Sequence, residues 1–561
     1  MIQRLRNVLA KRLGEIEFEL KISDTPEHGH ISTNAPFVLS KKEGIPVKEA
    51  AEEIRSVLHK GTSTQYFERI ETAGGFVNMW LTPQTLADEL SKMISAGFNY
   101  GKPPQKSKET VIVEYSSPNI AKPMHVGHLR STVIGDALAR VFEFCGYKTV
   151  RWNYLGDWGT QFGKLIAAYK MWGQKKGVGR SVDGLNELYV RFHKEAKTNL
   201  ELEDKGREEF SKLEKGDKEN RKLWKAFKKI SLREFNKIYN LLGVHFSVNI
   251  SESYYEKELP KVVDKLKEHK IAKESEGALV VNLDRFDLPT AMIQKSDGST
   301  LYITRDIANL EYRIDEYKPS RILYVVGNEQ SLHFSQLFTI AKLLDLKGDV
   351  ELAHVKHGLV VSSERKKLST REGTAIKLEE LLKKAMFLAE QNIKERDIKF
   401  KKGEMKDIVH AVAIGAVKYN DLSQNRMSDI SFDWDKMLSF EGNSGPYLQY
   451  TYARLKSILR KAKTVPRKRI DSVGSEKDQA LILKLAEFPW VLQRTIDAYL
   501  PNYLANYLYE LAKEINSFYH SEPVLYSEPE IRALRLNLVK SSARTLKTGL
   551  NLLGIETVER M

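Results

Sequence analysis

Two patterns of apolar residues follow one another early in the second hundred residues. Thr110 to Tyr115 is a short run that is apolar through its middle, typical of a parallel strand covered on both faces. From His128 to Gly146 apolar residues recur in steps of three and four, as on one face of a helix, and the glycine can end it. Lys148 to Tyr154 follows as a second strand. Strand, helix and strand in this order predict a βαβ unit and hence a doubly wound parallel sheet.

The rest of the chain divides into a smaller unit before this sheet and a helical unit after it. Residues 1–105 predict a small mixed α/β domain that ends in a basic, turn-rich linker. Residues 106–405 hold the doubly wound, Rossmann-like domain, with a highly charged helical insertion at about 175–276. Residues 406–561 follow helical spacing throughout. The predicted fold class is therefore multidomain α/β, with a small N-terminal domain and an all-helical C-terminal bundle.

Composition and charge narrow the class of protein. The chain has 89 basic and 74 acidic residues, a formal charge of +15, which favours a polyanionic partner such as nucleic acid over a role in solubility alone. No apolar run is long enough to span a membrane, and the N-terminus does not resemble a secretory signal, so we expect a cytoplasmic protein. The single cysteine, Cys145, excludes an internal disulfide and a zinc ribbon, and we expect it to be a buried apolar residue.

A strong local signal lies between the first strand and its helix. The loop contains His125-Val-Gly-His128, preceded by Lys122, at the edge of the sheet where open α/β folds bind ligands. A helix N-terminus offers free N–H groups to phosphate, two histidines can add donors, and Gly127 permits close approach of a nucleotide. Taken alone, the same spacing also fits two structural histidines or half of a metal site.

A second signal lies far along the chain. Lys366 to Arg371 reads Lys-Lys-Leu-Ser-Thr-Arg, inside a loop dense in serine, glycine and charge. A mobile basic loop can close over a polyphosphate and stabilise the charge that develops on a leaving group. The alternative is a solvated surface run, which is the usual fate of such segments.

Together the two signals resemble the class I aminoacyl-tRNA synthetases. The family's "HIGH" motif corresponds to His125–His128 and its "KMSKS" motif to Lys367–Arg371. The sequences around them resemble the arginyl-tRNA synthetases, as do Leu301–Asp306, Val326–Phe334 and Glu441–Arg454. The class pattern ends the second motif with lysine where this chain has arginine, a departure that many arginyl enzymes share.

The resemblance implies ATP-dependent attachment of L-arginine to tRNA(Arg) through arginyl-adenylate, with adenylate formation that needs bound tRNA. It implies ATP as substrate with Mg²⁺ on its phosphates, no dedicated metal site, no membrane, and a monomer. The catalytic residues would be His125, His128, Lys122, Lys367, Ser369 and Arg371. The ATP contacts would be His125, Gly127, His128, Lys367 and, near the adenine, His333. The arginine pocket would consist of Glu114, Asn119, Tyr302, Asp306 and Gln330.

Elementary chemistry supports that pocket, because carboxylates and an amide in fixed geometry suit a planar guanidinium with five donors. Asp306 can instead be a helix cap. The resemblance also implies that the N-terminal domain contacts the tRNA corner and the C-terminal bundle binds the anticodon. Candidate tRNA contacts are Asn34, Phe37 and Lys41 in the first, and Tyr503 and Tyr507, with Tyr499 and Tyr509, in the second. Each can equally be a core residue.

Two other functions remain to be weighed. A non-catalytic RNA-binding or arginine-sensing protein on the same fold is the alternative to an enzyme, and it would be favoured by loss of His125, His128 or Asp306, all of which are present. A dinucleotide-dependent oxidoreductase is disfavoured because no Gly-x-Gly-x-x-Gly follows the first strand.

Overall fold

The computed structural model describes residues 2–14, 18–23, 26–61, 66–173, 179–346, 348–361, 376–395, 400–401, 403–466, 470–471 and 473–561. The chain forms two compact units, and each is described by itself. One unit combines residues 1–104, 393–419 and 438–561, and the other combines residues 105–392 and 420–437.

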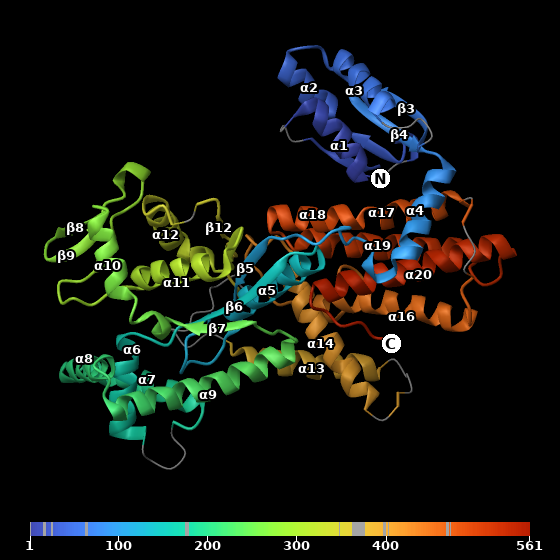
Figure 1. Ribbon diagram of the computed structural model, residues 1–561. Helices are drawn as coiled ribbons and strands as arrows, with labels where there is room; N and C mark the ends of the chain where they lie inside the picture. The colour runs from blue at the N-terminus through green and yellow to red at the C-terminus, as the bar shows by residue number, and fades with distance from the viewer. Residues whose placement is uncertain are drawn as a thin grey trace. The chain divides into compact units, whose positions relative to one another are not determined.

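The second unit is built on five parallel strands (Figure 1). In spatial order they are β12 (Glu351–His354), β11 (Arg321–Tyr324), β5 (Thr110–Glu114), β6 (Lys148–Leu155) and β7 (Val248–Ser251). The register pairs Ile112 with Val150 on one side and with Ile322 on the other, and all three side chains are buried. The continuously apolar run predicted for the first strand therefore forms the centre of the sheet, which confirms the doubly wound fold.

The strand order reverses at β5. The chain first moves from β5 to β6 and β7 on one side, and later places β11 and β12 on the other. At such a reversal the connections leave the sheet in opposite directions, so a crevice opens beyond the carboxyl end of the central strand. Helix α5 (Val126–Phe144) begins at this end of β5 and packs along β5 and β6.

Helices and a small second sheet complete this unit. They are α6 (Thr160–Ala168), the π-helical turn η4 (Tyr169–Gly173), α7 (Val182–Ala196), α8 (Glu201–Glu214), α9 (Lys218–Leu242), the 3-10 turn η5 (Glu252–Tyr255), α10 (Leu259–Glu268), α11 (Tyr302–Tyr317), η7 (Asn328–Gln330), α12 (Ser331–Leu343) and α13 (Leu378–Lys394). The second sheet is antiparallel, in the order β10 (Ala291–Gln294), β9 (Ala278–Val281) and β8 (Ala272–Ser275).

The charged stretch at 175–276 differs in part from the helical insertion predicted for it. Its described residues up to Leu242 form α7, α8 and α9, but β7 then joins the parallel sheet and β8 joins the small one. Both strands have four residues, and most of their side chains are half-buried or exposed, because each strand lies at the edge of its sheet. Such short, partly polar strands carry no clear period-two pattern to distinguish them in the sequence.

The first unit begins with a four-stranded antiparallel sheet. Its order is β1 (Leu20–Ile22), β2 (Ile31–Thr33), β4 (Phe76–Leu81) and β3 (Phe67–Ala73). Helices α2 (Ala35–Glu43) and α3 (Val47–Gly61) pack on it, and α1 (Ile2–Leu13) packs on α3. The predicted small α/β domain is therefore present, with its buried side chains alternating along β2 as expected for a sheet with one covered face.

A helical bundle forms the rest of the first unit. Its helices are α4 (Pro83–Ala96), α14 (Glu404–Leu422), α16 (Gly445–Ala462), α17 (Glu476–Ala486), α18 (Phe488–Ala498), α19 (Asn502–Ser521) and α20 (Pro529–Leu552). The last residues of α14 belong to the second unit, as does the short α15 (Trp434–Leu438) up to Met437. The leucines spaced by three and four in α20 are buried, which confirms the predicted apolar face. No helix among the described residues is long and apolar enough to cross a membrane.

Candidate active site

The carboxyl ends of the parallel strands bring several candidate residues, predicted and unpredicted, to one edge of the sheet. Glu114 ends β5, Gly156 follows β6, and Glu252 follows β7. Gln330 and His333 follow β11, and α11, which carries Tyr302 and Asp306, leads into that strand. These residues are far apart in the sequence but share one edge because parallel strands all end on the same side.

The loop between β5 and α5 is held in an unusual backbone conformation. Ser116, Ser117 and Ala121 have φ angles of 70°, 45° and 62°, which non-glycine residues rarely adopt. Buried hydrogen bonds hold it there: the Ser131 hydroxyl accepts from the Ser116 N–H at 2.8 Å, and the Ser231 hydroxyl accepts from the Ala121 N–H at 2.8 Å. The loop is thus fixed before any ligand arrives.

The two histidines of the first motif cap their own helix. The N–H of Gly127 donates to Nδ1 of His125 at 3.1 Å, and the N–H of His125 donates to Nδ1 of His128 at 3.1 Å. Because each Nδ1 accepts a hydrogen bond, the proton of each neutral ring lies on Nε2. The motif therefore presents two Nε2–H donors at the positive end of the α5 dipole, which is a site suited to phosphate oxygens.

Both rings stay neutral near physiological pH. Burial, with a smaller contribution from the nearby His125, lowers the pKa of His128 to about 3. Burial also lowers the pKa of His125, and the Lys122 ammonium adds to that effect. A neutral ring is a hydrogen-bond donor without a full charge, so attraction to the phosphates must come from the helix end and from the lysines.

After the second motif, the described part of the chain resumes at Ile376, beside the first motif. The N–H of Val126 donates to the carbonyl of Ile376 at 3.1 Å, and the N–H of Leu378 donates to the carbonyl of Met124 at 3.0 Å. Lys377 thereby pairs with His125 as in an antiparallel bridge. The end of the second motif's loop is thus bonded to the loop of the first. Lys367, Ser369 and Arg371 themselves lie outside the described residues.

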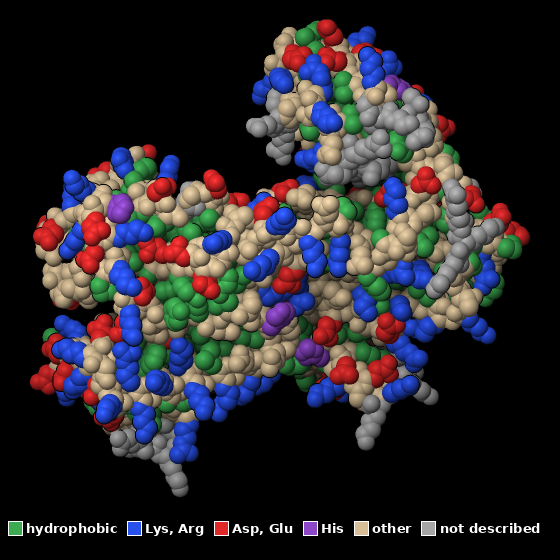
Figure 2. Space-filling model, in the orientation of Figure 1, with side chains coloured by type: hydrophobic (Ala, Val, Ile, Leu, Met, Phe, Trp, Pro, Cys, Tyr) green, Lys and Arg blue, Asp and Glu red, His purple; other side chains and the backbone are tan. Residues whose placement is uncertain are grey.

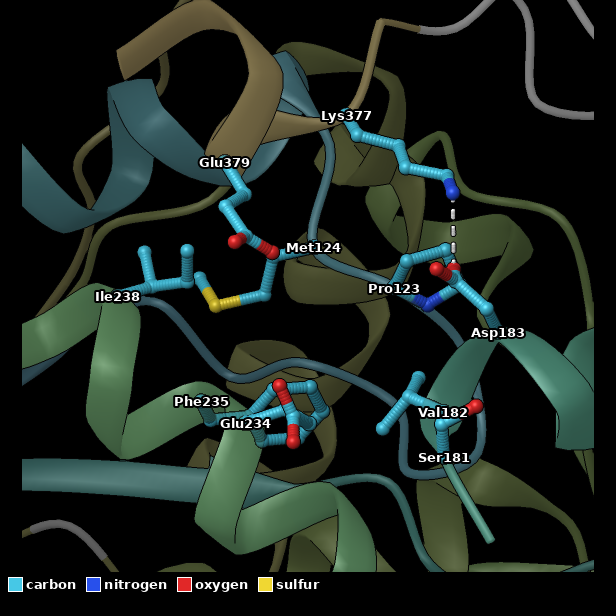
Figure 3. A pocket seen from close by; sticks show the side chains of 10 residues that line it. All are labelled: Pro123, Met124, Ser181, Val182, Asp183, Glu234, Phe235, Ile238, Lys377 and Glu379. Carbon is cyan, nitrogen blue, oxygen red and sulfur yellow. Dashed lines mark ion pairs between the residues drawn. The ribbon is translucent and has the colours of Figure 1, made fainter. Parts of the chain in front are cut away.

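A small pocket of about 110 Å³ lies behind the first motif (Figure 3). Apolar side chains including Met124, Phe235 and Ile238 line it, and Glu234 and Glu379 stand among them. On its rim the Lys377 ammonium is 3.0 Å from the Asp183 carboxylate, which ties the end of the second motif's loop to α7. The pocket therefore joins α7, α9 and α13 around the residue that precedes His125.

Asp306 and His333 form a pair. Nε2 of His333 lies 2.7 Å from Oδ2 of Asp306, so this histidine, expected near the adenine, contacts the carboxylate expected to bind arginine. Burial alone would lower the pKa of His333, but the hydrogen bond and the charges of Asp306 and Glu114 outweigh it and raise the pKa. Asp306 is not the N-terminal cap of α11, a position held by Leu301.

Glu252 is a carboxylate of this site that the sequence analysis missed. It is 9% exposed and accepts a hydrogen bond from the Trp158 N–H at 3.3 Å. Burial, and after it the negative charge of Asp306, raise its pKa to about 8. Two carboxylates that repel each other at a sheet edge are an arrangement that a cation would stabilise. The available signal was a glutamate directly after a strand, but this strand fell in the stretch predicted to be helical.

Glu114 has a partner within the protein. Its carboxylate forms an ion pair with Arg313 of α11, and both side chains are buried. The Arg313 guanidinium lies 4.4 Å from the centre of the Trp152 ring, and its Nε and Nη1 have no hydrogen-bond partner among the described residues. Burial raises the pKa of Glu114 while Arg313 opposes the rise. Glu114 is thus held by a partner within the protein.

The other predicted pocket residues are accessible. Asn119 and Gln330 are exposed, and Tyr302 is 55% exposed with its hydroxyl near Gly159. A side chain at Gly156 would meet the Asn119 amide oxygen at 1.9 Å, so glycine is required there for the asparagine to keep its place. Lys122 is half-buried, with Nζ 4.8 Å from the centre of the Tyr189 ring on α7.

Comparison with known protein families agrees with these features. The sequence model of the family "tRNA synthetases class I (R), catalytic domain" matches residues 89–434, which is more than half of the chain. The chain belongs to the class I arginyl-tRNA synthetases. The arginyl tRNA synthetase N terminal domain matches residues 1–81, and the DALR anticodon binding domain matches residues 448–561.

Individual arginyl-tRNA synthetases resemble the chain over its whole length. The arginine--tRNA ligase of Clostridium perfringens is 40% identical over 571 residues, which cover 100% of this chain and 99% of that protein. That of Halothermothrix orenii is 39% identical, covering 98% and 96%. Among solved structures, arginyl-tRNA synthetase of Thermus thermophilus has a TM-score of 0.87 at 25% identity, covering 100% and 99%, and that of Plasmodium falciparum has 0.82 at 29%, covering 100% and 98%.

The residues predicted to contact tRNA in the N-terminal domain differ in their surroundings. The amide oxygen of Asn34 accepts from the Glu19 N–H at 2.7 Å, so its side chain holds two segments of this domain together. Phe37 is 40% exposed and makes an edge contact with Phe76, which is 42% exposed. Lys41 is exposed on the same helix. The two phenylalanines form an aromatic surface, of which the sequence analysis recognised only Phe37.

The tyrosines of the anticodon-binding domain also divide into two kinds. Tyr507 is 5% exposed and its hydroxyl donates to the carbonyl of Lys484 at 2.9 Å. Its prediction as a stacking residue is therefore corrected: it belongs to the core, as does Tyr499 at 9% exposure. Tyr503 is half-buried, and the Arg494 guanidinium lies 4.4 Å from the centre of its ring. An aromatic ring stacked by arginine at the surface remains suited to a nucleobase.

Proposed function

We propose that the chain catalyses the ATP-dependent attachment of L-arginine to tRNA(Arg), giving arginyl-tRNA, AMP and pyrophosphate. The observation that carries this proposal is the pair of sites at one sheet edge: a phosphate-binding helix end with two neutral histidines, and a carboxylate pair suited to a guanidinium. Full-length similarity to arginine--tRNA ligases supports it. Arginine-dependent exchange of pyrophosphate into ATP, measured in the presence of tRNA with a panel of amino acids, tests it.

The reaction takes two steps. The arginine carboxylate attacks the α-phosphorus of ATP, the bond to the β-phosphate breaks, and arginyl-adenylate and pyrophosphate result. A hydroxyl of the terminal ribose of tRNA, the 2′-hydroxyl by the family's class, then attacks the arginyl carbonyl and releases AMP. The chain need form no covalent intermediate, so its contribution is to position the reactants and to stabilise charge.

Each predicted group has a role in this scheme. The Nε2–H groups of His125 and His128 and the α5 N-terminus bind the phosphates, with Gly127 allowing close approach. Asp306 and Glu252 bind the guanidinium, Tyr302 packs against it, and Asn119, Gln330 and Glu114 complete the pocket. His333, predicted to lie near the adenine, also acts on the arginine pocket through Asp306.

Mg²⁺ would accompany ATP on its phosphates, where it would neutralise part of their charge. The described residues contain no group of three or more His, Cys, Asp or Glu side chains arranged to hold a metal ion, so ligands for it would come mostly from the phosphates and water. We further propose that the enzyme acts as a monomer and in the cytoplasm. Sedimentation of the full chain with and without tRNA tests the oligomeric state.

The affinity for arginine is expected to rise with pH up to about pH 8. Glu252, with a pKa of about 8, is protonated below that value and then offers no charge to the guanidinium, which is always cationic. Binding should therefore release a proton, and the Kd should fall by up to about tenfold per pH unit between pH 6.5 and 8. Deprotonation of His333 removes its positive charge from Asp306, and this also raises the affinity for arginine as the pH rises.

Calorimetry in two buffers of different ionisation enthalpy measures both the Kd for arginine and the number of protons released on binding. Glu252→Gln should flatten the pH dependence, whereas Glu311→Gln, the same change on a carboxylate of α11 that pairs with Lys265, should leave it intact. A Kd that is constant over this range, or proton uptake on binding, would show that Glu252 does not face the substrate.

The N-terminal domain is expected to lose tRNA affinity when its aromatic surface is reduced. Phe37→Ala should weaken tRNA binding by about tenfold, because one base stacked on an aromatic side chain is worth roughly 1–3 kcal/mol. Filter binding with tRNA(Arg) measures the effect. Phe387→Ala, which removes a 59% exposed phenylalanine from α13, is the control. Equal binding by the Phe37 variant and the wild type would exclude this surface as a tRNA contact.

A further inference from the structure

The exposed face of α9 carries a line of basic side chains. Lys218, Lys222, Lys225, Lys229 and Arg233 follow one another in steps of three or four, so they lie on one face of the helix, and all five are exposed. Within the part of the chain that the structure describes, the four lysines make no ion pair. Figure 2 shows basic side chains gathered along α9. Like charges at this spacing destabilise a helix, so a partner that neutralises them would stabilise it.

The neighbouring helix has the opposite character. Helix α8 holds six acidic residues in fourteen positions, two of which pair with lysines of α6 and η4, namely Glu203 with Lys164 and Glu209 with Lys170. The insertion is therefore not uniformly basic, and five of its exposed basic residues follow one face of α9. A segregated charge of this kind attracts a polyanion and also orients it.

A pocket of about 310 Å³ borders the basic face. Helix α9 contributes Ala226, Phe227, Ile230 and Arg233 to it, and Tyr169 and Arg180 line it from the segments before α7. The Tyr169 ring makes an edge contact with Phe227 at 5.4 Å between ring centres. The volume of this pocket is within the range of small-molecule sites. The aromatic ring of Tyr169 with the guanidinium groups of Arg180 and Arg233 is a surface on which nucleobases stack.

The same helix leads to the active site. Further along α9, Phe235 and Ile238 line the pocket that also contains Met124, the residue before His125. From Ile230 to Ile238 the distance along the helix axis is about 12 Å, at 1.5 Å per residue. Towards the sheet, the Lys228 ammonium is 2.8 Å from Asp157, so the helix is fixed to the loop after β6.

We propose that α9 binds the single-stranded 3′ end of tRNA, its lysines contacting the phosphates and the pocket beside Tyr169 holding an unpaired base. The proposal rests on the proposed function, which supplies the tRNA and requires its terminal ribose to reach the unit that carries His125. The charge of the stripe selects a polyanion, and the aromatic pocket selects one with an unstacked base over a paired stem or a bare acidic surface.

Two variants separate the two contacts. Ala226→Phe fills the pocket from an exposed position without changing charge, and Lys222→Ala/Lys225→Ala/Lys229→Ala removes three charges from the stripe. The matched control removes three exposed lysines from α10 and α12: Lys261→Ala/Lys267→Ala/Lys342→Ala. Each full-length variant is titrated with intact tRNA(Arg) and with tRNA(Arg) trimmed of its single-stranded 3′ nucleotides, at several salt concentrations.

The Ala226 variant should bind intact tRNA about tenfold more weakly and trimmed tRNA like the wild type. The triple variant should reduce the slope of log K against log salt by about 2, at roughly 0.7 for each single-strand phosphate contact, and the control triple should not. Equal losses on intact and trimmed tRNA, or no loss, would overturn the proposal. A wild-type chain that neither binds nor charges tRNA(Arg) would instead overturn the proposed function.

Discussion

Asp306→Asn is expected to raise the KM for arginine by about 30- to 4,000-fold. Leaving the guanidinium without a buried counter-charge typically costs about 2–5 kcal/mol, and each 1.4 kcal/mol is a factor of ten. Asp306 is the carboxylate that both raises the pKa of Glu252 and pairs with His333, so its loss removes charge from the centre of the site. The KM values for ATP and tRNA should change little.

Aminoacylation at varied arginine concentration, with saturating ATP and tRNA, measures this effect. Glu311→Gln makes the same chemical change elsewhere on α11 and should leave all three KM values near those of the wild type. Lysine is also cationic but lacks the planar fork of donors, so the wild type should use it poorly. An Asp306 variant with a normal KM for arginine, or a wild type that activates lysine as well as arginine, would contradict this assignment of the pocket.

Lys122→Ala is expected to slow arginyl-adenylate formation by about 100-fold, roughly the loss seen on removing one oriented donor from a site of developing charge. Lys122 precedes Pro123, which limits the backbone, and its charge is close enough to His125 to lower that pKa. Its Nζ now lies over Tyr189 on α7. Lys377, the other described lysine beside the motif, is already paired with Asp183. The position of Lys122 in the loop beside His125 makes it the candidate ammonium for the departing pyrophosphate.

Single-turnover measurement of adenylate formation decides between this lysine and the arginine that ends the second motif. Lys122→Ala and Arg371→Ala are compared with Lys148→Ala, which removes an exposed lysine at the start of β6. The affinity for tRNA should be nearly unchanged in all three. If the Arg371 variant lost activity while the Lys122 variant kept a near-normal rate, the two roles would be reversed.

Local patterns in the sequence determined the architecture and the location of the phosphate site. The apolar run at the first strand and the helical spacing after it are properties of adjacent residues, so the βαβ unit could be predicted from them. The first motif lies between those two elements, and the fold therefore places it at the sheet edge. The roles of its histidines as caps follow from the same short segment.

Only the tertiary structure decided which distant groups share a site. The Glu114–Arg313 pair joins residues 199 positions apart. The charge of Asp306 acts on Glu252 because β7, a short edge strand without a clear sequence pattern, joins the sheet. Burial of Tyr507 depends likewise on the packing of α17 and α19. Periodicity shows that a face is apolar, and composition shows that a residue can be charged. Neither specifies which distant groups surround a carboxylate, and those groups decide whether it is paired, what its pKa is and whether it can bind a substrate.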